Sequence, residues 1–240
     1  MAPRRTVVVA DPAFAVGRDL DPVETELKLS ATGPAPLRRL AEVETLGGTP
    51  LGTPETYLEL DRYLDTDDGR LAAAKWACRL RSRSRTYRVS LKGPPIAAHE
   101  LGGALHRRPE IEGVASARPD PSAWPPSAAR DRLVELAGDR PLREQLTLRQ
   151  RRTQRSVGSD HDRVGTLSLD RVLVVRDGEP MGRLWCVELE LAGSTVAAAD
   201  RNAGVLVPRL LAELLSVGEL AIEPLTKLER ALALVGRARS

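Results

Sequence analysis

The segment VETELKL, residues 23–29, alternates charged and apolar side chains over the length of a β-strand. Successive side chains of a strand point to opposite faces, so Glu24, Glu26 and Lys28 share one face and the leucines share the other. The apolar face predicts contact with a hydrophobic core. The charged face predicts either solvent or a polar interior, and that choice decides what kind of protein this is.

Charged side chains recur with the same two-residue period in later segments of the chain. They are Arg79 with Arg81, Arg88 with Lys92, Arg108 with Glu110 and Glu112, and Glu188 with Glu190. In any single strand, this pattern also fits an ordinary half-exposed sheet with its charges in solvent. Its repetition over many strands favours a closed barrel whose interior is charged.

The periodic segments predict eight strands and three helical regions. We expect strands at 23–29, 56–66, 75–81, 86–92, 107–113, 142–157, 164–176 and 182–192, and helices at 37–46, 128–137 and 203–235. The turn at residues 177–180, DGEP, is typical of a hairpin. We therefore predict an α+β fold, an eight-stranded antiparallel β-barrel forming a tunnel with flanking helices. Residues 1–22 would be a flexible N-terminal arm, and residues 23–236 the tunnel domain with its C-terminal helices.

Composition excludes several classes of protein. No apolar run approaches the length of a transmembrane helix, and no signal-peptide core is present. The two cysteines, Cys78 and Cys186, lie far apart, which indicates neither a zinc site nor a disulfide framework. Aromatic residues make up 3% and the net charge is +3, so we expect no nucleic-acid and no membrane partner. A cytoplasmic protein that is a monomer or homodimer is the expectation.

A charged interior is costly unless its charges pair or bind counterions. Interleaved carboxylates and cations suit a ligand that is a metal-bound polyanion. Carboxylate oxygens would hold Mg²⁺ or Mn²⁺, and arginine and lysine would hold phosphate oxygens. The chain has no glycine-rich phosphate loop, so side chains would bind the phosphates.

The motif Glu24-x-Glu26-x-Lys28 is similar to the ExExK signature of the CYTH family, also called triphosphate tunnel metalloenzymes. Further segments resemble the family's later motifs in the same order over residues 23–232. They are Tyr63-x-Asp65-Thr66, Arg79-x-Arg81, Leu91-Lys92-Gly93, Arg108-x-Glu110-x-Glu112, Arg149 to Arg152, Leu169-Asp170-Arg171-Val172, Val187-Glu188-Leu189-Glu190 and Thr226-Lys227-Leu228-Glu229-Arg230-Ala231.

This resemblance implies an eight-stranded tunnel that binds a triphosphate with a divalent metal, and it implies roles for individual residues. Catalytic roles would fall to Glu24, Glu26 and Lys28. Metal would be held by Glu24, Glu26, Asp170, Glu188 and Glu190, and substrate phosphates by Lys28, Arg79, Arg81, Lys92, Arg149, Arg152 and Lys227. Glu110, Glu112 and Arg230 would support them.

The leading functional prediction is metal-dependent hydrolysis of a triphosphate anhydride, most simply inorganic triphosphate, because no stacking aromatic is evident beside the charged set. A small-molecule triphosphate or polyphosphate is the expected partner. The alternatives are a class IV-type adenylyl cyclase making cyclic AMP from ATP, a thiamine triphosphatase, and a non-catalytic polyphosphate- or nucleotide-binding module. The carboxylates argue against the last, since a pure anion binder gains nothing from them without metal.

The sequence does not decide which of Arg149, Arg151 and Arg152 point into the tunnel. Strict alternation pairs Arg149 with Arg151, whereas the family pattern favours Arg152, and a β-bulge would reconcile the two. Arg155 departs from the family pattern, where an aromatic is common.

Several other features are expected to be structural. We expect the run RSRSR at 81–85 to be mainly a solvated hairpin loop and the three histidines to lie in loops without metal spacing. Both cysteines would be small core residues on outward faces, the tryptophans would pack in the core, and Asp65-Thr66 would cap or turn the chain.

Lysine usage points to the same site. Of 36 basic residues, only Lys28, Lys75, Lys92 and Lys227 are lysines. All but Lys75 fall on the tunnel motif. Lysine and arginine are not interchangeable in a crowded phosphate site, so the retained lysines support the assignment.

Overall fold

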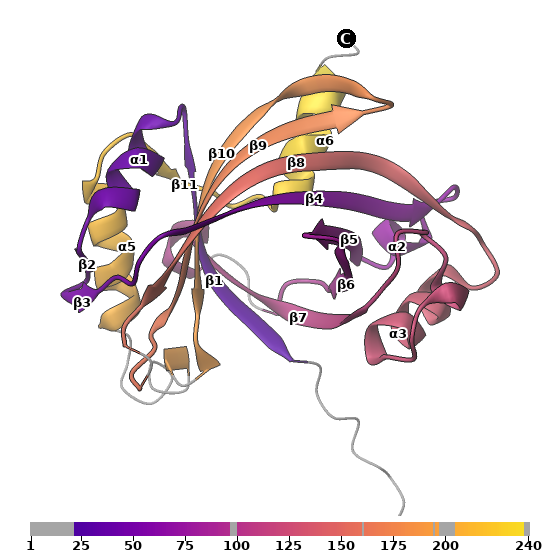
Figure 1. The fold of residues 1–240 in the computed structure, drawn as a ribbon, viewed down its shortest axis with the longest axis horizontal. Helices are drawn as coiled ribbons and strands as arrows, with labels where there is room; N and C mark the ends of the chain where they lie inside the picture. The colour runs from indigo at the N-terminus through magenta and orange to yellow at the C-terminus, as the bar shows by residue number, and fades with distance from the viewer. Residues whose placement is uncertain (1–21, 97–99, 160, 194, 197–204, 238–240) are drawn as a thin grey trace, which may run out of the picture.

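Eight antiparallel strands close into a barrel in the computed structural model (Figure 1). The structure describes residues 22–96, 100–159, 161–193, 195–196 and 205–237, so almost all of the expected N-terminal arm lies outside it. The barrel strands are β1 (Val23–Ala31), β4 (Glu55–Thr66), β5 (Ala77–Arg83), β6 (Thr86–Lys92), β7 (Leu105–Val114), β8 (Leu142–Val157), β9 (Gly165–Arg176) and β10 (Glu179–Leu191). Their order is β10-β9-β8-β4-β5-β6-β7-β1, and β1 pairs with β10 to close the ring. The predicted fold class is confirmed.

Helices cover the outside of the barrel at two places (Figure 1). At one, α1 (Ala35–Glu42) and α5 (Leu206–Ser216) pack on the outward leucines of β1, β9 and β10, among them Leu27, Leu169 and Leu189. At the other, α2 (Arg70–Ala73) and α3 (Ala128–Ala137) cover the outward faces of β5 and β6. The apolar faces predicted from the two-residue period therefore meet helices outside the barrel, which leaves the charged faces inside.

The interior is apolar at one end. There α6 (Lys227–Arg237) places Ala231 and Val235 against the inward side chains Leu148, Val174 and Cys186. The prediction that Cys186 faces outward is wrong, because it shares the inward face of β10 with Glu188. The polar part of the tunnel therefore begins beside a hydrophobic plug.

Two-residue turns join two of the hairpins. Asp177 and Gly178, with φ of 53° and 85°, connect β9 to β10 as the sequence predicts. Ser84 and Arg85 adopt similar values between β5 and β6. Because only these two residues leave the ladder, Arg83 belongs to β5 instead of a solvated loop, and its guanidinium lies 3.2 Å from the centre of the Tyr57 ring.

The first helix ends at Glu42, four residues earlier than predicted, and Arg155 supplies the reason. This buried guanidinium on β8 donates hydrogen bonds to five backbone carbonyls that follow or end the helix. They belong to Leu40, Ala41, Val43, Leu51 and Gly52. A cation at a helix C-terminus satisfies carbonyls that lack a helical partner. The arginine thus fixes the segment carrying β2 (Thr45–Leu46) and β3 (Thr49–Pro50) against the barrel.

The C-terminal tail is two helices and a strand, not continuous helix. The chain leaves α5 through Gly218 and Glu219, which both have positive φ. It then forms β11 (Leu220–Ile222), which pairs with β1, before α6 begins. Short 3-10 turns at Glu100–Gly103 and Pro121–Ala123 complete the described elements. No helix in the described ranges is long and apolar enough to cross a membrane.

Candidate active site

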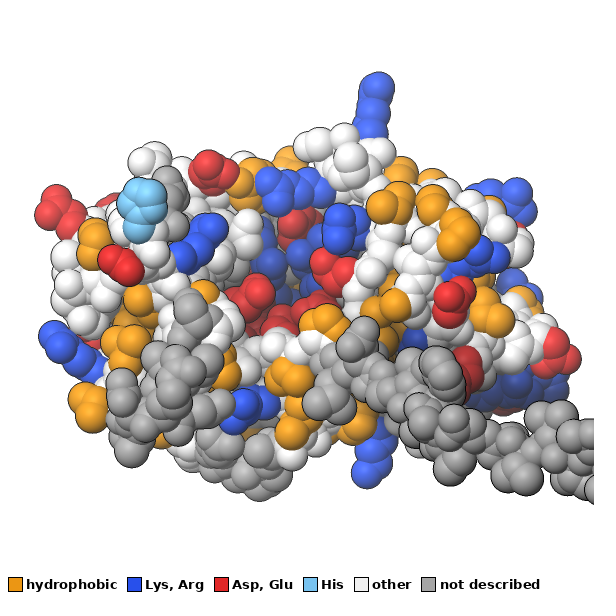
Figure 2. All heavy atoms as spheres, turned by 90° about the horizontal axis from the view of Figure 1, so that it is seen from below, with side chains coloured by type: hydrophobic (Ala, Val, Ile, Leu, Met, Phe, Trp, Pro, Cys, Tyr) orange, Lys and Arg blue, Asp and Glu red, His pale blue; other side chains and the backbone are white. Residues whose placement is uncertain are grey.

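The charged side chains that alternate along the strands point into the barrel and line one cavity. Figure 2 looks into this hollow, where acidic and basic side chains gather below the rim. They line a cavity of about 220 Å³. Among the residues predicted from the sequence, the cavity brings together Glu24, Glu26, Lys28, Arg79, Arg81, Lys92, Glu110, Glu112, Arg152, Glu188, Glu190 and Lys227.

Strands β1 and β10 form the acidic wall of this cavity. Their register sets Glu26 opposite Glu190 and Lys28 opposite Glu188. The Nζ of Lys28 lies 2.9 Å from Glu26 Oε1. Burial opposes ionisation of Glu26, but Lys28 and the nearby cations outweigh it and lower its pKa well below the usual value. Burial in turn lowers the pKa of Lys28.

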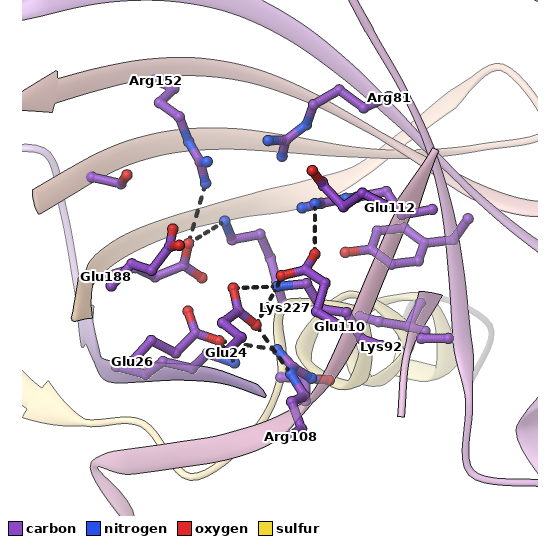
Figure 3. Close-up of a pocket in the computed structure, with 18 of the residues that line it drawn as sticks. Glu24, Glu26, Arg81, Lys92, Arg108, Glu110, Glu112, Arg152, Glu188 and Lys227 are labelled. Atoms are coloured by element: carbon purple, nitrogen blue, oxygen red, sulfur yellow. Dashed lines mark hydrogen bonds and ion pairs between the residues drawn. The ribbon is translucent and has the colours of Figure 1, made fainter. Parts of the chain in front are cut away.

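Glu24 lies in the cavity between Lys92 and Arg108 (Figure 3). Lys92 Nζ lies 2.6 Å from both of its oxygens, and Arg108 Nε lies 3.5 Å away. Burial and repulsion from Glu26 nevertheless raise the pKa of Glu24 to about 7. The pKa of Glu190 is also raised, by burial and by the neighbouring carboxylates Glu110 and Glu26. Glu24 and Glu190 are therefore protonated more easily than an ordinary glutamate.

A second cluster joins the barrel to the last helix. Arg152 donates to both oxygens of Asp170, at 2.7 and 2.6 Å, and Lys227 Nζ lies 2.7 Å from Asp170 Oδ2. Both cations also reach Glu188 Oε2, at 3.1 and 3.0 Å. Burial opposes ionisation of Asp170, yet the two cations hold its pKa below the usual value. Asp170 is fully enclosed and its oxygens are taken, so the carboxylate orients Arg152 and Lys227.

Asp61 plays a similar part for the arginines of β5, and the sequence analysis missed it. Both Asp61 oxygens accept from Arg81 at 2.7 Å, and Gln150 Nε2 donates to Oδ2 at 2.5 Å. Arg79 Nη1 lies 3.9 Å from the same oxygen. Burial opposes these cations, but they lower the pKa of Asp61 to about 2.

The signal for this part of the wall was present in the sequence. Glu59, Asp61 and Tyr63 continue the two-residue period along β4, and only the end of that strand was matched to a motif. Glu59 is buried, with Arg81 at 3.3 Å. Arg108, 3.0 Å from Glu26, was quoted in a motif but given no role. Asp65 instead caps α2, accepting from the backbone N–H of Leu71 at 2.9 Å, which confirms its predicted capping role.

Three predicted residues do not line the cavity: Asp170, which is enclosed behind Arg152 and Lys227, and Arg149 and Arg230. Arg149 is exposed on the outer wall, because β8 pairs with β4 in unbroken register from Leu60 and Arg149 to Tyr57 and Arg152. Alternation thus turns Gln150 and Arg152 inward, without the expected bulge. Arg230 lies behind the cavity, where its Nε is 3.0 Å from Glu223 Oε2.

A larger cavity of about 560 Å³ opens beside the charged one and shares Lys92 and Arg108 with it. Its apolar lining includes Trp76, Leu228 and Leu232. His106 also borders it and lies on β7, not in a loop, with Nε2 3.0 Å from the Glu223 carbonyl. Burial lowers the pKa of this histidine. Trp76 was expected to serve only packing, but its ring borders open space.

The carboxylates suit a hard divalent cation in chemistry. Glu24, Glu26, Glu188 and Glu190 offer oxygen ligands from two neighbouring strands, and burial raises the pKa of Glu24 and Glu190, which a bound cation would lower. In the ranges that the structure describes, no three acidic, histidine or cysteine side chains converge as a ready metal site. Lysines and arginines contact both oxygens of Glu24 and one oxygen each of Glu26 and Glu188, so a metal ion would compete with those ion pairs.

Comparisons with known proteins agree with the geometry. The model of the CYTH domain matches residues 23–203. The structure of HpAC1 from Hippeastrum, described as an adenylyl cyclase candidate with dominant triphosphatase activity, has 19% identity and a TM-score of 0.60, covering 88% of this chain and 95% of that chain. An adenylate cyclase candidate from Bacillus halodurans has 19% identity and a TM-score of 0.52, covering 87% and 97%.

A protein from Pyrococcus horikoshii has 18% identity and a TM-score of 0.51, covering 87% of this chain and 98% of that chain. At such identities the likeness shows a shared fold. No curated protein sequence matches this chain significantly.

Proposed function

The chain belongs to the CYTH family, whose domain model matches most of its length, and from that membership we propose that it is a divalent-metal-dependent hydrolase of a triphosphate anhydride. Inorganic triphosphate is the proposed substrate. The observation that carries the proposal is one cavity that combines an acidic wall on β1 and β10 with cations from β5, β6, β8 and α6.

The cations are placed to receive phosphate oxygens. Arg79, Arg81 and Lys92 come from neighbouring strands, and Arg152 and Lys227 line the same cavity, with Arg152 and Arg81 both contacting Glu59. Arginine offers a planar fork that binds two oxygens, whereas lysine offers a compact point charge. Asp61 and Asp170 hold three of these cations in place before substrate arrives. Preorganised cations stabilise charge that develops on a leaving diphosphate at little reorganisation cost.

The acidic wall is the proposed metal side. Glu24, Glu26, Glu188 and Glu190 would hold Mg²⁺ or Mn²⁺, which when bound neutralises phosphate charge and lowers the pKa of a coordinated water. Asp170, predicted as a ligand, is instead proposed to position Arg152 and Lys227, since its oxygens are occupied. Lys28, 2.9 Å from Glu26, would contact the phosphate nearest that wall.

An organic triphosphate is the second candidate substrate. The apolar cavity beside Lys92 and Arg108 has room for a ring system, and Trp76 borders it. Hydrolysis of thiamine triphosphate or a nucleoside triphosphate would use the same charged cavity and place the organic group there. Cyclic AMP formation from ATP is the remaining enzymatic alternative, and it needs a ribose hydroxyl to displace water as the nucleophile.

A product assay separates these functions. The protein is incubated with Mg²⁺ or Mn²⁺ and, in turn, triphosphate, ATP and thiamine triphosphate, and phosphate, diphosphate and cyclic AMP are quantified. The proposal expects phosphate and diphosphate from triphosphate, and none when EDTA replaces the metal. Cyclic AMP from ATP without phosphate release would overturn it. Tight polyphosphate binding without any product would make the protein a binding module.

A further inference from the structure

A second concentration of positive charge lies on the outer wall of the barrel, away from the tunnel. Arg151 and Arg171 lie directly opposite each other on β8 and β9 and both point outward. Arg38 reaches the same place from α1. These three arginines border one cavity of about 170 Å³ between the helix and the two strands.

The three arginines gather like charges around one cavity on the outside of the barrel. Like charges directly opposite on an antiparallel pair repel each other. None of the three arginines has an ion pair or side-chain hydrogen bond with any residue that the structure describes. Other exposed arginines such as Arg39 and Arg70 pair with carboxylates, whereas Arg149 and Arg183 pair with no described residue, so the shared cavity is what distinguishes these three. The cavity thus gathers three cations without a partner from the described chain.

The walls of the cavity favour a compact anion. Leu37 and Leu169 form an apolar side of the cavity, and the three exposed guanidinium groups lie around it. Glu42 is the single acidic residue in the lining. A set with three guanidinium forks and one exposed carboxylate lacks the oxygen ligands that a metal ion needs, so binding would not depend on a divalent cation.

We propose that this outer cavity is a metal-independent binding site for a condensed phosphate of two or three units. Three forks offer several paired donors, which match an anion with oxygens on more than one phosphorus atom better than they match a single carboxylate. The cavity is close in volume to the tunnel cavity, about 170 against 220 Å³. Arg151 and Arg171 are the chain neighbours of Arg152 and Asp170, so one stretch of wall would bind phosphate on both sides.

The experiment is equilibrium binding of radiolabelled triphosphate and diphosphate in EDTA, with stoichiometry measured for three proteins. They are the wild type, the double variant Arg151→Gln/Arg171→Gln, and the matched double variant Arg149→Gln/Arg183→Gln. The matched pair removes the same charge from the same outer face without touching the cavity lining. The wild type and matched variant should bind one more equivalent than Arg151→Gln/Arg171→Gln. All three should show the same metal-dependent turnover, since none of the changes lies in the tunnel.

Equal stoichiometry in the three proteins, or equal loss in both double variants, would overturn the site. Competition by citrate as strong as that by diphosphate would show a general anion surface, which also overturns it. Thermal unfolding of each variant verifies that the barrel is intact. Because binding is measured without metal or turnover, the result stands whether or not the wild type hydrolyses triphosphate.

Discussion

Arg152 and Asp170 lie opposite each other on β8 and β9, and the guanidinium of one donates to both oxygens of the other at 2.7 and 2.6 Å. Lys227 shares the same carboxylate from α6. A single buried anion thus ties two strands and the last helix together. It also sets the positions of two of the proposed phosphate-binding cations.

Replacing Asp170 with Asn should lower the free energy of unfolding by about 3–5 kcal/mol, because it leaves buried cations without their main counter-charge. Urea denaturation of both proteins measures the difference. The control is Glu135→Gln, which breaks an exposed pair with Arg132 and should cost less than about 1 kcal/mol. Equal losses in the two variants would show that Asp170 does not organise this cluster.

Replacing Glu26 with Gln should reduce metal-dependent turnover by about 100-fold or more while leaving the fold intact, since it removes a carboxylate from the proposed metal wall. Phosphate release at saturating Mg²⁺ measures turnover, and circular dichroism verifies the fold. Glu179→Gln, on an exposed end of β10, should retain activity. Near-normal turnover in Glu26→Gln would refute the site assignment.

Metal binding should strengthen as the pH rises through about 7, where Glu24 loses its proton. The folded-state pKa of Glu24 lies above its unfolded value of 4.5. In the metal-free protein its contribution to stability is therefore complete below pH 4.5 and falls as the pH rises to about 7. The rise in melting temperature on adding Mg²⁺ should be larger at pH 8 than at pH 6. Glu24→Gln should lose most of this pH dependence, and an unchanged dependence would contradict the proposed role of Glu24.

Replacing Arg155 with Met should destabilise the protein by about 2–4 kcal/mol, because carbonyls at the end of α1 lose a charged donor. Amide exchange in residues 40–52 should accelerate before exchange in the barrel strands does. Arg149→Met, on the exposed face of the same strand, should change stability by no more than about 0.5 kcal/mol. If α1 exchanges at the wild-type rate in Arg155→Met, the capping account fails.

Replacing Lys227 with Arg should also be damaging, although the charge is kept. Lys227 is 9% exposed and its Nζ lies between Asp170 and Glu188, at 2.7 and 3.0 Å. A wider guanidinium there overpacks the site, at a cost of about 1–3 kcal/mol in stability. Thermal unfolding and turnover check this, with Lys75→Arg on the exposed surface as the silent control. A Lys227→Arg protein that matches wild type in both would show the site is roomier than the structure indicates.

The barrel could be predicted from the sequence because side-chain direction in a strand follows from counting by two. That rule also decides between Arg149 and Arg152 once the unbroken pairing of β8 with β4 is known. The register between strands distant in sequence is a tertiary property, so the sequence left the choice open. The early end of α1 was equally hidden, since Arg155 lies more than a hundred residues further along the chain.

Within the site, the charged set was predictable but its internal pairing was not. The two-residue period predicts that Arg81 faces the tunnel. Only the fold shows that Arg81 donates hydrogen bonds to both oxygens of Asp61. Likewise, only the fold shows that Asp170, predicted as a metal ligand, lies between the cations Arg152 and Lys227. The two-residue period indicates which side chains of a strand share the inward face, whereas distances across the barrel specify what each residue does there.

The scarcity of lysine gives this molecule a built-in chemical reporter. Lys28, Lys92 and Lys227 lie in the tunnel wall, and Lys75 is exposed outside it. Amine-acylating reagents followed by peptide mass spectrometry would therefore label Lys75 as an internal reference. Acylation of the other three would read out how open the tunnel is, residue by residue, and protection by a ligand would map which phosphate contacts it makes.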